Sequence, residues 1–389
     1  MTAQLGKKRV SRMPALEILR LDQRSQWNEI VRQSVRYDFY HFAEYHTLAE
    51  ERGEGIAHLF IYKDGPFVVA LPLLLRPVAA IPGLEGVGEG WSDATSVYGY
   101  AGPIASHAEI PAQVLRSFRA SLDETLRGLA VVAVFSRLHP LIPQRELIAD
   151  LGEYVSVGRT ISIDLTLTID QQRAQYRKNH KIGINKLRRL GATCIHDRHM
   201  VYLTEFVRIY HETMRRVGAS DEYLFERDYY EKLAATTELG VQLFVCVLAN
   251  QAICGGLFTL CDGIVQYHLG ATRDDFLSLA PMKLAFDTVR LWSNERGAHV
   301  MHLGGGVGAQ EDSLFHFKAG FSDRRHDFAV LRWIVLPDSY ESLCQQKNRW
   351  NEQNALKAVS SGYFPAYGCP AVSARTQVEQ ECSTTTRQL

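Results

Sequence analysis

The sequence predicts an α/β protein with mixed α+β sheets, built from two similar lobes in tandem that a basic helix joins. Two observations lead to this prediction. The order helix, strand–turn–strand, helix, strand occurs once in each half of the chain, as expected for a duplicated unit. A segment without any acidic residue, 171–191, lies between the halves. The chain has 389 residues, which is enough for about two domains of ordinary size.

Each half opens with a helical pattern rich in aromatic residues and continues into a predicted β-hairpin. The helical patterns cover about 39–51 and 226–237. Two apolar runs around a short polar turn are typical of a hairpin. The hairpins are expected at 58–78, with the turn at Asp64-Gly65, and at 242–263, with the turn at 249–251.

A second helix in each half ends in Arg-Gly and leads into an apolar strand. These stretches are 114–138 and 284–306. Gly128 and Gly297 stand where a helix C-cap is expected, because glycine adopts the left-handed conformation that ends many helices. The repeated order therefore extends over most of both halves.

The acid-free segment is predicted to be an amphipathic connecting helix over 171–192. Tyr176, His180, Ile184 and Leu187 share one face by helical spacing. The other side is basic, and it is either a solvated face or a surface for phosphate groups. The candidate phosphate or tRNA contacts are Arg177, Lys178, Lys181 and Arg188.

The predicted boundaries follow from this segment. The first lobe covers 1–170, and the second covers 193–370 together with a C-terminal helix, which could pack back onto either lobe. The polar stretch 371–389 has little to bury, so a disordered tail is expected there.

The overall charge excludes a protein whose whole surface binds nucleic acid. Lys plus Arg and Asp plus Glu number 43 each, so a phosphate site must be local.

The seven cysteines are odd in number and form no CxxC pair, which makes a disulfide framework or a thiolate zinc site unexpected. With no apolar leader and no membrane-length apolar run, a cytoplasmic protein without a membrane span is expected.

The densest group of chemically useful residues lies between His302 and Ser322. A strand ending at Leu303 runs into three glycines, 304–306, which no Gly-Lys-Ser/Thr follows, so a P-loop is a weak interpretation. Lys318 stands between Phe317 and Phe321. It is either an oxyanion stabiliser in a poorly hydrated site or a lysine whose ammonium reaches water. Glu311, Asp312 and His268 are candidates for the general base.

The string Phe317-Lys318-Ala319-Gly320-Phe321 after a glycine-ended strand resembles the signature of the Fem-type peptidyltransferase family of the GNAT superfamily. The resemblance extends over about 13–367. Further matching pieces are 96–103, 135–141, the basic segment, 211–219, 267–272 and 363–367.

This resemblance implies two tandem GNAT-like lobes and the transfer of an aminoacyl group from aminoacyl-tRNA to an amine on a peptide or small metabolite. No cofactor or metal is implied, since the tRNA serves as a donor co-substrate. Lys318 inherits the charge-stabilising role, with Glu311 and His268 as further catalytic candidates. The implied substrate-binding residues are Arg216 of the Thr213-x-x-Arg216 pattern, Tyr267, Phe317, and, more loosely, Asp93 and Tyr98.

Other interpretations of these residues stay open. Tyr267 and His268 could be core residues, Arg216 could pair with Glu212, and Arg137 with His139 could simply close a strand. GNAT enzymes that use acetyl-CoA hold its pyrophosphate with Q/R-x-x-G-x-G/A at a helix N-terminus. The stretch after Tyr267 has no such motif, which favours tRNA. An acyl-CoA-dependent acyltransferase acting on a sugar or small metabolite, and a catalytically silent GNAT-like binding protein, are the alternatives.

Overall fold

One mixed sheet runs through the whole molecule in the computed structural model, which describes residues 16–219, 223–360 and 362–370. The strand order is β1-β2-β3-β4-β6-β13-β7-β12-β11-β10-β9-β8, and β5 pairs with β3. The strands are β1 (Glu17–Leu19), β2 (Ile56–Asp64), β3 (Phe67–Pro77), β4 (Ser92–Thr95), β5 (Ile104–Ala105), β6 (Val131–Arg137), β7 (Glu153–Asp164), β8 (Thr193–Asp197), β9 (Val241–Leu248), β10 (Gln251–Cys261), β11 (Ile264–Thr272), β12 (Val300–Gly304) and β13 (Arg325–Ile334).

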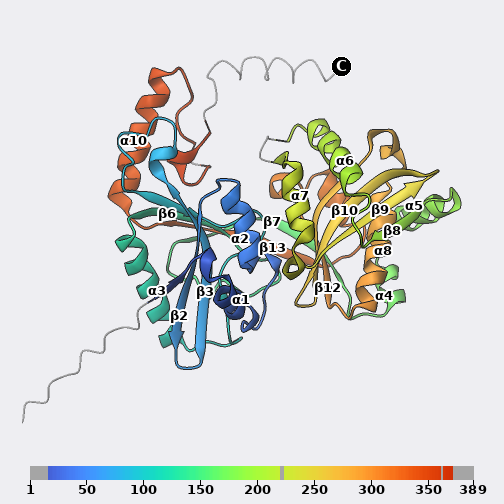
Figure 1. The fold of residues 1–389 in the computed structure, drawn as a ribbon, viewed down its shortest axis with the longest axis horizontal. Helices are drawn as coiled ribbons and strands as arrows, with labels where there is room; N and C mark the ends of the chain where they lie inside the picture. The colour runs from blue at the N-terminus through green and yellow to red at the C-terminus, as the bar shows by residue number, and fades with distance from the viewer. Residues whose placement is uncertain (1–15, 220–222, 361, 371–389) are drawn as a thin grey trace, which may run out of the picture.

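Helices cover both faces of this sheet (Figure 1). They are α1 (Arg24–Arg32), α2 (Ala43–Glu51), α3 (Ala112–Gly128), α4 (Ile169–Ala174), α5 (Lys178–Arg189), α6 (Leu203–Arg216), α7 (Arg227–Ala235), α8 (Met282–Glu295), α9 (Ser313–Lys318) and α10 (Pro337–Gln353). The mixed α/β class and the two lobes are as predicted. No helix within the described ranges is long and apolar enough to cross a bilayer.

The two predicted hairpins are present, and each half repeats the order helix, hairpin, helix, strand. β2 pairs with β3, and β9 pairs with β10. The second turn is formed by Ala249 and Asn250, both with positive φ, 48° and 61°, which suits the twist of a two-residue hairpin loop. The predicted duplication is therefore a structural one.

Only one of the two expected glycine C-caps is correct. Gly297 has φ +68° after α8. Gly128 is still the last residue of α3, and the left-handed residue there is Ala130, φ +53°. The left-handed residue after α3 therefore lies two positions after Gly128, where the cap was expected.

The C-terminal part of the chain is built into the first lobe. β13 lies between β6 and β7 and pairs with both. α10 follows it and buries Leu343 against Val78 and Val132. The sequence left open which lobe the last helix packs against, and the structure shows that it packs against the first lobe. The second lobe, predicted at 193–370, therefore does not include this helix. The tail 371–389 lies outside the described residues.

β7 connects the lobes because it is shared between them. Its residues up to Ile161 pair with β13, and its last residues pair with β12. α1 and α2 of the first lobe and α6 and α7 of the second bury their apolar faces in one common cluster, and α2 contacts α7. The lobes are therefore held together by a continuous sheet and a shared core.

The basic segment forms two helices rather than one. α4 ends at Ala174, α5 begins at Lys178, and the chain between them is not helical. Tyr176 lies in this break, buried, where its hydroxyl accepts a hydrogen bond from Arg290 Nε at 2.9 Å. The predicted apolar face is correct, since His180, Ile184 and Leu187 are buried on α5.

Candidate active site

Lys318 is the last residue of α9, and its side chain is buried with only 6% of the residue exposed. The helix begins at a side-chain cap, because Asp312 Oδ1 accepts from the Phe315 amide at 2.9 Å. Lys318 Nζ donates to Gly305 O at 2.6 Å and lies 5.4 Å from the centroid of the Tyr267 ring. The interpretation of Lys318 as a surface lysine with its ammonium in water is therefore wrong.

Burial also changes the charge of this lysine. Desolvation lowers the pKa of Lys318 to about 7, while the nearby Asp312 carboxylate acts in the opposite direction. A buried ammonium with few compensating charges is costly. Lys318 therefore exchanges its proton near neutral pH, as groups in active sites often do.

A cavity of about 520 Å³ opens beside Lys318, and both lobes contribute to its walls. This Lys318 cavity is lined from the first lobe by Tyr40, Tyr98, Tyr100 and Arg137, and from the second by Tyr210, Tyr267, His268 and Lys318. The volume is within the range of small-molecule sites. A cavity between lobes can bring two reactants together.

The three glycines at the end of β12, 304–306, keep the floor of this cavity open. Gly304 has φ +75°, and a Cβ at that position would lie 3.3 Å from Lys318 Nζ and 3.6 Å from the Tyr100 hydroxyl. A Cβ on Gly305 would lie 2.8 Å from Arg159 O. The glycines thus leave space next to the ammonium and supply the carbonyl that orients it.

His268 lies in the cavity wall as a neutral imidazole. Burial lowers the pKa of His268 to about 3. Its Nε2 is 3.4 Å from the Tyr229 hydroxyl, and its Nδ1 has no hydrogen-bond partner among the described residues. A histidine with this pKa is a weak base at neutral pH, but its free nitrogen can interact with a ligand.

Three tyrosines of the cavity, Tyr98, Tyr100 and Tyr267, are protonated phenols. Burial raises the pKa of Tyr98 to about 12 and raises the pKa of Tyr100 and of Tyr267 further. Each can donate a hydrogen bond at neutral pH. Together with Lys318 they offer several hydrogen-bond donors to one cavity, which suits the stabilisation of a developing oxyanion.

Four of the residues selected from the sequence therefore meet in one cavity: Lys318, His268, Tyr267 and Tyr98. Tyr100 and Arg137 also line the cavity but were not among the site residues selected from the sequence. Tyr100 lies in the stretch 96–103 that carries the resemblance, and that position could have indicated it. Arg137 closes β6, as the plainer interpretation had it, and also lines the cavity.

The other selected residues lie elsewhere. Glu311 is exposed and pairs with Arg159. Arg216 pairs with Asp274 rather than with Glu212, and its Nη1 also donates to Thr272 O at 3.2 Å. Because these partners are distant in sequence, spacing alone could not indicate them.

Phe317 and Asp93 are also outside the Lys318 cavity. Phe317 packs against His180, Phe286 and Phe321. Asp93 is buried and accepts from Arg76 Nε at 2.7 Å. Their proposed substrate contacts remain predictions.

The basic side of α4 and α5 is partly neutralised from another helix. Asp287 of α8 is fully buried and pairs with Arg173, Arg188 and Arg290. Of the candidate contacts, Arg188 is thus engaged. Arg177 Nη1 donates to His316 O at 3.1 Å, and Lys181 Nζ donates to Ala174 O at 3.0 Å.

Several cations on α5 remain available at the surface. Lys178, Lys186 and Arg189 are exposed and form no ion pair with any carboxylate in the described ranges. The basic character that the sequence indicated is therefore reduced but not removed.

Comparison with known proteins agrees with this architecture. Residues 174–318 match the acetyltransferase (GNAT) domain family, a range that ends at Lys318. No protein of curated function matches the sequence.

Solved structures extend the similarity to both lobes. FemX is 13% identical with a TM-score of 0.61, over 84% of this chain and 99% of FemX. L-PGS from Bacillus licheniformis is 14% identical with a TM-score of 0.52, over 85% of this chain and 96% of that one. The C-terminal domain of a putative lysylphosphatidylglycerol synthetase from Agrobacterium fabrum is 14% identical with a TM-score of 0.51, over 83% and 94%. At these identities the shared feature is the two-lobed fold.

Proposed function

We propose that this chain, a Fem-like GNAT acyltransferase by its domain match and its fold, transfers an aminoacyl group from aminoacyl-tRNA to an amine and forms an amide bond. The observation that carries the proposal is Lys318, an ammonium buried beside a cavity that both lobes line. Aminoacyl-tRNA is the donor co-substrate, and no cofactor is proposed. The similar domain from Agrobacterium fabrum belongs to a putative lysylphosphatidylglycerol synthetase, a name that indicates the transfer of a lysyl group, and this supports an aminoacyl donor.

In the proposed reaction the acceptor amine attacks the carbonyl carbon of the aminoacyl ester within the cavity. A C–N bond forms, and negative charge collects on the carbonyl oxygen. Collapse of this intermediate breaks the C–O bond to the tRNA ribose. The amine proton passes to the leaving ribose oxygen, so no covalent enzyme intermediate is needed. Bringing both reactants into one cavity supplies part of the acceleration.

Each residue of the site has a proposed role in this reaction. Protonated Lys318, oriented by Gly305 O, stabilises the oxyanion, and the phenols of Tyr100 and Tyr267 add donors. His268 is proposed to contact the acceptor through its free Nδ1. The exposed cations of α5 are proposed to contact tRNA phosphates. Glu311 stays a candidate general base whose participation requires it to leave Arg159.

An acyl-CoA-dependent transfer is the second candidate, because the matched domain family is described as acetyltransferase. The test offers the purified chain a pool of labelled aminoacyl-tRNAs and, separately, labelled acetyl-CoA, with a mixture of small amines and peptides. We expect RNase-sensitive amide formation from the tRNA pool. Amide formation from acetyl-CoA alone would overturn the proposal in favour of the second candidate.

Variants connect this activity to the site. Lys318→Met should lower the transfer rate by about 10²–10³-fold, the usual effect of removing one oxyanion donor. Glu311→Gln is the matched comparison, and retention of activity there would remove Glu311 from the candidates. Full activity of Lys318→Met would show that transfer, if any, does not depend on this ammonium.

A further inference from the structure

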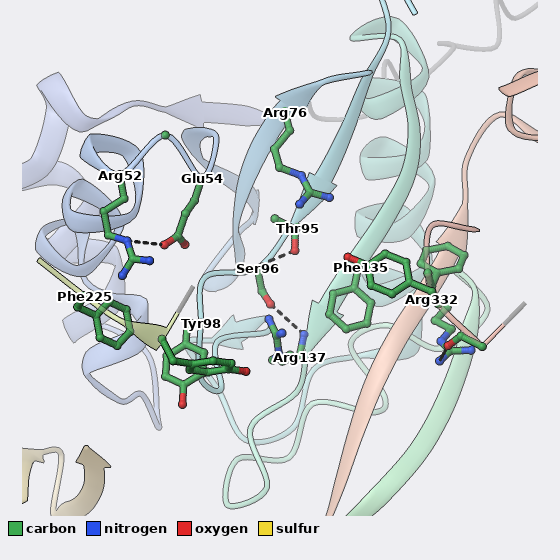
Figure 2. Close-up of a pocket in the computed structure, with 15 residues that line it drawn as sticks. Arg52, Glu54, Arg76, Thr95, Ser96, Tyr98, Phe135, Arg137, Phe225 and Arg332 are labelled. Carbon is green, nitrogen blue, oxygen red and sulfur yellow. Dashed lines mark hydrogen bonds and ion pairs between the residues drawn. The ribbon is translucent and has the colours of Figure 1, made fainter. Parts of the chain in front are cut away.

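A second pocket of about 530 Å³ is lined mostly by the first lobe, with Tyr223 and Phe225 from the second, and four arginines from four different elements line it (Figure 2). Arg52 follows α2, Arg76 lies on β3, Arg137 ends β6, and Arg332 lies on β13. We call this the arginine pocket. Guanidinium groups that line one pocket repel one another, so the presence of four of them there needs an explanation.

The carboxylates nearby balance only half of this charge. Arg52 Nε pairs with Glu54 at 3.1 Å, and Arg76 Nε pairs with Asp93 at 2.7 Å. Arg137 and Arg332 form no ion pair with any carboxylate that the structure describes. Arg332 donates to Gly362 O at 3.2 Å, while its buried Nε has no partner in the described ranges. The pocket thus carries unbalanced positive charge.

The remaining walls suit a ligand with a polar end and a flat or apolar body. Phe135, Phe225 and Phe364 line the pocket, together with the hydroxyl groups of Thr95 and Ser96. The guanidinium carbon of Arg137 lies 5.3 Å from the centroid of the Phe135 ring, a contact that orients this side chain. Figure 2 shows Arg76 and Arg137 on opposite sides of Thr95 and Ser96.

The arginine pocket adjoins the Lys318 cavity. Tyr98, Arg137 and Tyr223 line both. Arg137 therefore lies at the boundary between the Lys318 cavity, which contains the candidate reactive groups, and the arginine pocket, which carries the positive charge. A single ligand can occupy both spaces at once.

We infer that the arginine pocket binds an anionic group, a carboxylate or a phosphate, of the acceptor whose amine lies in the Lys318 cavity. This inference rests on the proposed function. Arginine forms planar, paired hydrogen bonds with both kinds of oxyanion, and two uncompensated arginines lose their mutual repulsion when such a group binds. Amines without an acidic group leave the pocket unfilled and are poorer acceptors.

Binding of simple anions to the full chain tests the pocket itself. Isothermal titration calorimetry with inorganic phosphate and with succinate distinguishes the two kinds of anion. We expect one of them to bind, and expect Arg332→Gln and, separately, Arg137→Gln to weaken it by about tenfold or more. Arg116→Gln, on the exposed face of α3, is the matched control and should bind as the unchanged protein does. Equal binding by all four proteins, or by none, would overturn the inference.

Transfer assays then test the link to the acceptor. The compounds 6-aminohexanol, 6-aminohexanoate and 6-aminohexyl phosphate carry the same amine on the same chain and differ only in the distal group. We expect kcat/KM for one anionic acceptor to exceed that for the alcohol by about tenfold or more, and Arg332→Gln to bring the ratio close to one. Equal use of all three would overturn the acidic acceptor while leaving aminoacyl transfer intact. Anion binding without any tRNA-dependent transfer would instead count against the proposed function.

Discussion

At the scale of single residues, the position of Lys318 determines how the site responds to pH. Oxyanion stabilisation needs the protonated amine, and burial lowers the pKa of Lys318 to about 7. The protonated fraction therefore falls as the pH rises through about 7. A catalytic group with its pKa near the working pH responds to small changes in its surroundings.

The first prediction follows from this pKa. Single-turnover transfer from aminoacyl-tRNA, measured between pH 5.5 and 8.5, should decline on the alkaline side with a midpoint near pH 7. In Lys318→Arg the guanidinium stays charged over this range, so the alkaline decline should disappear even if the overall rate is lower. A rate that rises with pH equally in both proteins would reflect only the deprotonation of the acceptor amine, and it would contradict the role of Lys318 as a stabilising cation.

The sequence selected residues at the centre of the Lys318 cavity but not most of the residues around them. Lys318 and Tyr267 were selected through the family resemblance, because the phenylalanines beside Lys318 alone left both a buried and an exposed ammonium open. Arg216 and Glu311 could not be placed, since their partners Asp274 and Arg159 are brought to them only by the fold. Tyr100 was missed although it lies in the stretch 96–103 that carries the resemblance, since nothing in the local sequence separates it from Tyr98.

At the scale of elements, local periodicity predicted the hairpins and helices well. The break between α4 and α5 was not predicted, because its cause is tertiary. Tyr176 is held by Arg290, and Arg290 in turn by Asp287. A helix pattern cannot indicate a contact with a helix about a hundred residues away.

The second prediction concerns this network. Asp287 is fully buried and faces Arg173, Arg188 and Arg290. Asp287→Asn keeps the shape but leaves cations without their counter-charge, which should lower the free energy of unfolding by about 3–5 kcal/mol. Urea unfolding followed by circular dichroism measures the change. The exposed Asp275→Asn is the control, and an equal, small effect in both would contradict a structural role for the network.

The third prediction concerns the exposed cations of α5. The triple change Lys178→Gln, Lys186→Gln and Arg189→Gln should weaken tRNA binding and reduce the slope of log K against log salt by roughly 0.9 for each phosphate that is no longer neutralised. The control changes Arg24, Arg116 and Arg349 of the first lobe to Gln, which alters the net charge equally. Filter binding at several salt concentrations measures both. Equally weakened binding by the two proteins would show that only total charge matters.

At the scale of the whole molecule, the sequence predicted two lobes but not how they interlock. The internal repeat indicated two units in series. The pairing of β13 with β6 joins residues that are almost two hundred positions apart, and no local pattern carries that information. The same holds for α10, whose amphipathic pattern is compatible with either lobe.

The fourth prediction tests this interlocking. A fragment ending at residue 192 lacks β13 and α10, so the apolar residues of β6 and of the α10 contact, among them Val78 and Val132, lose their cover. We expect this fragment to be largely unfolded or aggregated by circular dichroism and size-exclusion chromatography. Co-expression with a fragment covering 193–389 should restore a soluble complex, because the second piece supplies the missing strand. A monomeric, cooperatively unfolding first fragment would contradict this expectation.

The central position of β13 also has a consequence during synthesis. A ribosome has made most of the chain before this strand emerges, and until then β6 and β7 each present an edge with free peptide groups. Such edges can pair with other nascent chains. These edges therefore stay unpaired during most of synthesis, and they are covered only when β13, the last strand of the described chain, pairs with two strands that were made much earlier.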